Sequence, residues 1–263
     1  MPQRDPIDRA ELRRSLSAHG WRAEHIEVVA ETGSTNADLI AAARDGAEAW
    51  TVLIASHQTA GRGRFRRSWA SPAGSSASIS VLLRPERSMQ NWPWLSLLTG
   101  VALAEAFVAV GVDAAVKWPN DVLAPGGKLC GILAERVETP EGPAVVVGFG
   151  INLSMTAEEL PVPTATSLLL EGVTCDPTEL VADVLARWRE LALAWAAEDD
   201  DALHRRYLAI SGTIGRRIRL LLDETGDEVV QGTAVGVDRT GRILVDVAGD
   251  VQAYAAGDVV HLR

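Results

Sequence analysis

The chain has 263 residues, a formal net charge of −10, and 47% apolar residues, which is enough for a folded core. An acidic surface disfavours non-specific binding of nucleic acid. The charged first 14 residues lead into no signal-peptide apolar region, and no run reads as a membrane span, so neither nucleic acid nor membrane is an expected partner. Only Cys130 and Cys175 occur, so no disulfide framework is expected and a reducing cytoplasm is the predicted location.

Hydrophobic periodicity and turn residues predict alternating helices and strands over the first four fifths of the chain. Helices are expected within residues 8–18, 31–46, 93–111, 177–198 and 201–211. Strands are expected within residues 25–30, 50–58, 75–85, 113–120, 126–137 and 143–153. Ser34, Thr35 and Asn36 are candidate N-caps for the second helix, and Gly46 is its expected end.

The pattern changes near Gly212, after which short strands alternate with frequent turns. These strands are expected within residues 216–223, 227–237, 242–247, 251–257 and 258–263. Their spacing predicts a small barrel of about five strands. We therefore place a domain boundary near residue 213, which divides the chain into residues 1–212 and 213–263.

One segment concentrates positive charge on this acidic chain. The run QTAGRGRFRRSW, residues 58–69, holds four arginines within six positions, interrupted by Gly61 and Gly63. Glycine lets a backbone approach an anion closely, and arginine donates paired hydrogen bonds to phosphate or carboxylate. The spacing matches neither a Walker loop nor the Gly-x-Gly-x-x-Gly motif of dinucleotide folds. An anion site and a plain solvated basic loop both remain open.

Three further segments carry polar residues at the ends of expected strands. Lys117 and Lys128 are the only lysines among 25 basic residues. They lie in the runs KWPNDVL and GGKLCGI, and the run GFGINL places Asn152 after two glycines. In KWPNDVL, Pro119 is expected to end the strand and Asn120 and Asp121 to form a turn. A compact ammonium fits among crowded oxygens where the wider arginine fork does not. Taken alone, Asn152 is equally well a satisfied turn residue.

Together, the runs ETGSTN, QTAGRGRFRRSWASPAG, KWPNDVL, GKLCGILAE and VVVGFGINL resemble the biotin–protein ligases, in the same order along the chain. Each motif is weak alone, and the match is dense over residues 31–153. The resemblance implies an α+β fold: a mixed sheet with flanking helices of the class II synthetase type, followed by a small SH3-like β-barrel.

The resemblance also implies an ATP-dependent, two-step ligase. Biotin's carboxylate would attack the α-phosphate of ATP to form biotinyl-5′-AMP. A lysine on the biotin carboxyl carrier domain of an acyl-CoA carboxylase would then take the biotin. Fixed cations suit this chemistry, because two anions must meet in the first step.

Site residues follow from the positions of the motifs. The residues expected to bind biotin are Ser34, Thr35, Asn36, Gln58, Gly61, Arg62, Gly63, Arg64, Lys128, Gly131 and Gly148. The residues expected at ATP or the adenylate are Arg64, Arg67, Trp69, Lys117, Asn120 and Asn152. Lys128, Arg64 and Arg67 are expected to be catalytic, and Asp121 is the candidate ligand for Mg²⁺. Trp69 packs either on the adenine or in the core, and both interpretations stay open.

Two alternatives remain at this point: a lipoate–protein ligase, and a non-catalytic protein that senses biotin or its adenylate. About thirty residues precede ETGSTN, too few for the helix-turn-helix domain that some family members carry, so no operator binding is expected. We also expect the arginine loop to be mobile without ligand, because its like charges repel one another.

Overall fold

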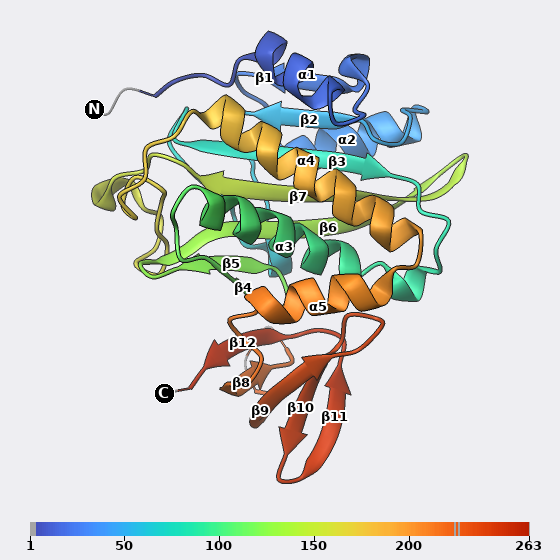
Figure 1. Ribbon diagram of the computed structural model, residues 1–263, viewed down its shortest axis with the longest axis vertical. Coiled ribbons are helices and arrows are strands. Elements are labelled where there is room, and N and C mark those ends of the chain that lie inside the picture. The colour runs from blue at the N-terminus through green and yellow to red at the C-terminus, as the bar shows by residue number, and fades with distance from the viewer. Residues whose placement is uncertain (1–3, 224, 226, 263) are drawn as a thin grey trace.

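A mixed seven-stranded sheet forms the body of the protein. The computed structural model describes residues 4–223, 225 and 227–262. The strand order is β1-β2-β3-β7-β6-β5-β4, with β1 and β2 parallel and the other neighbours antiparallel (Figure 1). The bounds are β1 Ile26–Val29, β2 Val52–Ala55, β3 Ser76–Leu83, β4 Ala115–Lys117, β5 Asp121–Ala124, β6 Gly127–Thr139 and β7 Gly142–Asn152. The α+β fold with a mixed sheet is confirmed.

Helices cover both faces of this sheet. Three long helices, α3 to α5, lie over one face (Figure 1), and α2 packs its Leu39 and Ala43 against Leu82 and Val146 on the other. The bounds are α1 Arg9–Ser17, α2 Thr35–Arg44, α3 Trp94–Ala109, α4 Pro177–Ala196 and α5 Asp200–Ile210. Because both faces are covered, all eight residues of β3 are buried, whereas the sequence suggested alternation. That burial takes the β3 serines into the interior.

The predicted position of the α2 N-cap is confirmed. Ser34 is the N-cap, and its hydroxyl accepts a hydrogen bond from the Ala37 amide. Thr35 and Asn36 follow inside the first turn, and both are buried. The cap therefore directs two polar side chains toward the sheet.

The segment that contains the core helix α3 differs from the expectation that no run is long and apolar enough to span a membrane. The segment Met89–Ala109 is long and apolar enough, by length and composition, to cross a membrane, although no such run was recognised in the sequence. Most of this segment is buried inside the protein. Its apolar surface on every side is explained by the sheet beneath it and by α4 and α5 around it (Figure 1).

A second difference concerns Asn120 and Asp121, which the sequence placed in a turn. Asp121 begins β5, a strand that pairs back on β4 with Lys117 opposite Asp121. The turn is thus limited to residues 118–120, and the hairpin holds Lys117 and Asp121 side by side.

The C-terminal strands form a separate five-stranded antiparallel sheet in the order β11-β10-β9-β8-β12. Their bounds are β8 Arg217–Leu221, β9 Val229–Val237, β10 Ile243–Val247, β11 Asp250–Tyr254 and β12 Asp258–His261. The five strands are confirmed, whereas the closed SH3-like barrel stays a prediction. We propose the division between residues 212 and 213 as the domain boundary, because it falls between α5 and β8.

The small sheet is fixed to the body by tryptophans. The Trp118 indole donates to the Gly241 carbonyl (3.0 Å) and the Trp94 indole to the Asp238 carbonyl (3.2 Å). Both indoles are almost fully buried. These contacts set the small sheet beside β4 and α5 (Figure 1), where one edge of it can complete a cavity in the body.

Candidate active site

A cavity of about 730 Å³ lies where the large sheet, the arginine loop and the small sheet meet. Every residue nominated from the sequence lines it except Gly61, which is buried within the arginine loop and accepts a hydrogen bond from the Trp69 amide (2.9 Å). The nominated lining residues are Ser34, Thr35, Asn36, Gln58, Arg62, Gly63, Arg64, Arg67, Trp69, Lys117, Asn120, Asp121, Lys128, Gly131, Gly148 and Asn152. Nominated residues as far apart in the sequence as Ser34 and Asn152, 118 positions, thus converge on one space.

The floor of the cavity is made of glycines on β6 and β7. Gly131 lies opposite Gly150 across these strands, and Gly148 precedes Gly150 by two residues in β7. A Cβ at Gly148 would lie 2.0 Å from the Asn36 Oδ1, and one at Gly150 would lie 2.4 Å from the Trp69 ring. The missing side chains therefore leave the space in which Asn36 and Trp69 sit.

One wall is the N-terminus of α2. The Thr35 amide donates to Gln58 Oε1 (2.8 Å), and the Thr35 hydroxyl lies 3.1 Å from the same oxygen. Asn36 donates from Nδ2 to Glu135 Oε2 (2.7 Å). This wall offers hydroxyl and amide groups in fixed orientations, which suits recognition of a small polar ring.

The arginine loop forms the roof. It contains a short 3-10 turn, Arg64–Arg66, in which Phe65 has a left-handed backbone (φ 52°). The Arg64 guanidinium lies 4.8 Å from the centre of the Phe65 ring, and that of Arg67 lies 5.6 Å from it. The side chain of Arg66 falls outside the part of the chain described.

Carboxylates within the protein pair with the three loop arginines whose side chains the structure describes, even without a ligand. Arg62 pairs with Glu135 of β6 (3.4 Å), and both Arg64 and Arg67 pair with Asp258 of β12. The sequence had suggested that only water or an external anion would balance these charges. The small sheet brings Asp258 to them, and loop mobility without ligand stays a prediction.

Arg64 is the most enclosed of these cations. Its Nη1 also donates to Asn120 Oδ1 (3.3 Å) and to the Gly257 carbonyl (3.2 Å). Burial lowers the pKa of its guanidinium from the ordinary value, while Asp258 and Asp121 act in the opposite direction. A partly desolvated cation of this kind interacts strongly with an anion placed beside it.

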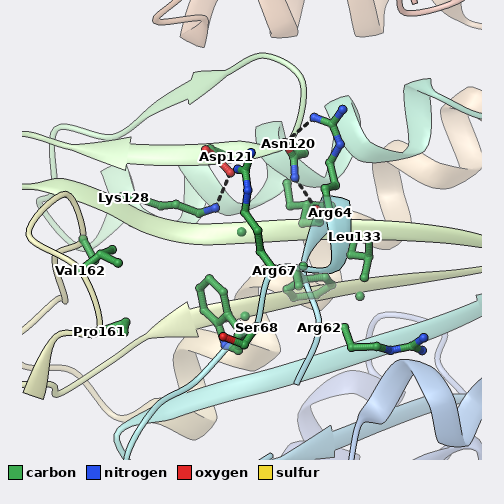
Figure 2. A pocket seen from close by; sticks show the side chains of 18 of the residues that line it. Arg62, Arg64, Arg67, Ser68, Asn120, Asp121, Lys128, Leu133, Pro161 and Val162 are labelled. Atoms are coloured by element: carbon green, nitrogen blue, oxygen red, sulfur yellow. Dashed lines mark hydrogen bonds and ion pairs between the residues drawn. The ribbon is translucent and has the colours of Figure 1, made fainter. Parts of the chain in front are cut away.

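Lys128 and Asp121 form the second charged group in the cavity. The Lys128 Nζ lies 2.6 Å from Asp121 Oδ1, and Figure 2 shows the two side chains pointing toward each other. The same ammonium lies 5.8 Å from the centre of the Trp69 ring. In the described residues no cluster of three His, Cys, Asp or Glu side chains could hold a metal ion, and Asp121 is engaged by Lys128 instead.

The Asn152 side chain donates hydrogen bonds to backbone carbonyls in this structure. Its Nδ2 donates to the Thr166 carbonyl (2.8 Å) and lies 3.4 Å from the Lys128 carbonyl, and the residue is buried. The interpretation of Asn152 as a satisfied structural residue therefore fits its contacts, and its expected contact with the adenylate stays a prediction.

Sequence reasoning missed the residues that other strands and loops bring to the site. Asp258 and Val260 reach the cavity from β12, and Val162 from the loop before α4. Figure 2 places Val162 beside the cavity. No local pattern marks these residues, because only the packing of the two sheets and the loop brings them to the arginines and Lys128.

Family models match both parts of this chain, and related proteins match it over most of its length. Residues 32–152 match the model of the biotin/lipoate A/B protein ligase family, and residues 213–262 match that of the biotin protein ligase C-terminal domain. A biotin–[acetyl-CoA-carboxylase] ligase of Mycobacterium tuberculosis is 44% identical, with 99% of this chain and 97% of the relative covered. Another, from Paracoccus denitrificans, is 34% identical over 88% and 98% of the two chains.

A solved structure has the same architecture. The biotin protein ligase of Aquifex aeolicus, in complex with biotin and ATP, superposes with a TM-score of 0.76 and is 26% identical. The superposition covers 90% of this chain and 98% of the other.

Proposed function

The chain belongs to the biotin protein ligase family, and from that premise we propose that it joins biotin to a carrier protein in two steps. In the first step a biotin carboxylate oxygen attacks the α-phosphorus of ATP, the bond to the β-phosphate breaks, and pyrophosphate leaves. In the second, a lysine amine of the biotin carboxyl carrier domain of an acyl-CoA carboxylase attacks the acyl carbon. The amine loses a proton and AMP leaves.

One observation carries this proposal: Arg64, Arg67 and Lys128 converge on a single cavity above a glycine floor. A carboxylate and a triphosphate repel each other, and cations fixed in advance reduce that repulsion without reorganisation during the reaction. Lys128 would lie between the biotin carboxylate and the α-phosphate. Arg64 and Arg67 would hold the phosphate that becomes part of the adenylate.

The remaining nominated residues divide between the two substrates. Ser34, Thr35, Gln58, Gly61, Arg62, Gly63, Gly131 and Gly148 would surround biotin, with Asn36 fixing the wall behind it. Trp69, Lys117, Asn120 and Asn152 would line the nucleotide side.

Both cysteines are free, with Cys130 buried, which suits the reducing cytoplasm that we propose for the reaction.

We also propose that ATP enters with Mg²⁺. Mg²⁺ is commonly held by one or two carboxylates together with substrate phosphates, so one protein carboxylate is enough. Asp121 would be that carboxylate, and the preceding residue, Asn120, carries another oxygen, Oδ1. The bound ion would neutralise part of the triphosphate charge. Asp121 pairs with Lys128 through Oδ1, so an ion there would bind through Oδ2 or displace the ammonium.

Biotin-dependent exchange of pyrophosphate into ATP tests the first step. The wild-type protein should catalyse it, and Lys128→Met should lower the rate by at least about a hundredfold, because removing one preorganised charge contact costs that much. Asp183→Asn, on the surface of α4, is a control that should keep the wild-type rate. Exchange that depends on lipoate instead would favour a lipoate ligase. Biotin binding without exchange would favour a sensor protein.

A further inference from the structure

A buried serine that the sequence patterns did not single out lies behind the N-terminus of α2. Ser80 is in the middle of β3 and is fully buried. Its Oγ lies 2.6 Å from Asn36 Oδ1 and 2.8 Å from Thr35 Oγ1. Both partners line the cavity, whereas Ser80 does not. It can therefore act on a ligand only through these two side chains.

The Asn36 amide is held in one orientation by protein groups. Its Nδ2 donates to Glu135 Oε2 (2.7 Å) and to the Leu133 carbonyl (3.1 Å), so both of its N–H donors have acceptors. Reversing the amide would place its oxygen against a carboxylate and a carbonyl. Oδ1 consequently faces Ser80 and acts there as an acceptor.

This orientation decides where the Ser80 proton goes. A hydroxyl has one proton, and Asn36 Oδ1 can only accept, so Ser80 donates to Asn36. The Ser80 oxygen then accepts the proton of the Thr35 hydroxyl. Two oxygens only 2.8 Å apart need a proton between them, and the Ser80 proton is already directed to Asn36 Oδ1, so the Thr35 hydroxyl must supply it. Gln58 Oε1, at 3.1 Å from Thr35 Oγ1, keeps the Thr35 amide as its donor. With its proton directed inward, Thr35 Oγ1 offers only lone pairs to the cavity.

We propose that Ser80 is a positioning residue that makes Thr35 a hydrogen-bond acceptor, so that this wall selects ligands with an N–H donor. The inference rests on the proposed function, because the cyclic urea of biotin carries two N–H groups. The dithiolane ring of lipoate carries none. Ser80 would thus contribute to discrimination between the two acids without touching either.

Calorimetry with Ser80→Ala tests the inference. The variant should bind biotin about tenfold more weakly, as expected when one buried hydrogen bond is lost. Desthiobiotin, which keeps the urea but lacks the sulfur ring, should weaken by the same factor, and ATP affinity should not change. A matched control is Thr99→Val, which removes a buried, hydrogen-bonded hydroxyl from α3, away from the cavity. This control should bind biotin as the wild type does.

A double-mutant cycle separates positioning from general loosening. In a Thr35→Val background Ser80→Ala should add nothing to the loss of biotin affinity, because Ser80 acts through the Thr35 hydroxyl. Should Ser80→Ala not fold, wild-type protein can be compared with Thr35→Val for a biotin methylated on its urea nitrogens. The preference for unmethylated biotin should shrink in Thr35→Val.

Three results would overturn the inference: additive losses in the cycle, a loss for biotin but not desthiobiotin, or an equal loss in Thr99→Val. An unchanged preference in the methylation test would do the same. A wild-type protein that binds neither biotin nor desthiobiotin would instead overturn the proposed function itself.

Discussion

Arg64 and Asp258 lie 194 positions apart in the chain, yet Arg64 Nη1 and Asp258 Oδ1 are 3.4 Å apart above the cavity. The same carboxylate also accepts from Arg67. Asp258 thus occupies the two cations that we propose for the phosphate of the adenylate. An anionic substrate therefore competes with this carboxylate for the two guanidinium groups.

Asp258→Asn should therefore loosen the arginine loop and favour external anions. Trypsin should cleave between residues 62 and 67 several-fold faster in the ligand-free variant, and pyrophosphate should bind several-fold more tightly, because a competing charge is gone. The stability cost should be below about 1 kcal/mol, since these ion pairs are partly exposed. Asp183→Asn, which removes a carboxylate paired with Arg187, is the control. Equal cleavage rates in the two variants would show that Asp258 does not restrain the arginine loop.

Gly150→Ala should damage the cavity more than its single methyl group suggests. The added Cβ would lie 2.4 Å from the Trp69 ring, so the indole would have to leave the glycine floor. We expect biotin affinity to fall at least about tenfold, because displacing this ring changes the shape of the cavity above the glycine floor. Gly236→Ala, on β9 with its nearest neighbour atom at 3.7 Å, is the matched control and should bind biotin normally. Unchanged tryptophan fluorescence and affinity in Gly150→Ala would contradict this account.

The sequence predicted those parts of the site whose residues lie close together in the chain. Residues of the α2 N-terminus and the arginine loop were found because each group lies in one short motif. Asp258 and Ser80 were missed for different physical reasons. Asp258 reaches the site only through the packing of the small sheet, and Ser80 is a polar residue on a strand whose two faces are both covered. The turn around Asp121 was misread because two short strands closed into a hairpin there.

Asn152→Ala should separate the structural interpretation from the nucleotide-binding one. The substitution removes the side-chain donor of the Thr166 carbonyl, whereas the Lys128 carbonyl keeps its hydrogen bond from the Thr166 amide (2.9 Å). We expect the free energy of unfolding in urea to fall by about 1–3 kcal/mol, the usual cost of buried groups left unpaired. If Asn152 is purely structural, ATP affinity measured on the folded fraction should stay within about threefold. A selective loss of ATP affinity with little change in stability would show that Asn152 contacts the nucleotide.

His261 should make the fold sensitive to mild acid. Burial, followed by the nearby charges of Lys117 and Arg216, lowers its pKa from the ordinary 6.5 to about 4. The unfolded chain therefore binds a proton between pH 6.5 and 4 that the folded protein does not, so stability is complete above pH 6.5 and falls as the pH drops toward 4. Because the ring is only half-buried, we expect a loss of about 1–2 kcal/mol over this range. His261→Gln keeps a polar partner for the Thr213 hydroxyl, which lies 3.2 Å from the ring nitrogen, but cannot titrate. Urea unfolding at several pH values should show a shallower loss in this variant than in the wild type, and parallel curves would rule out His261 as the cause.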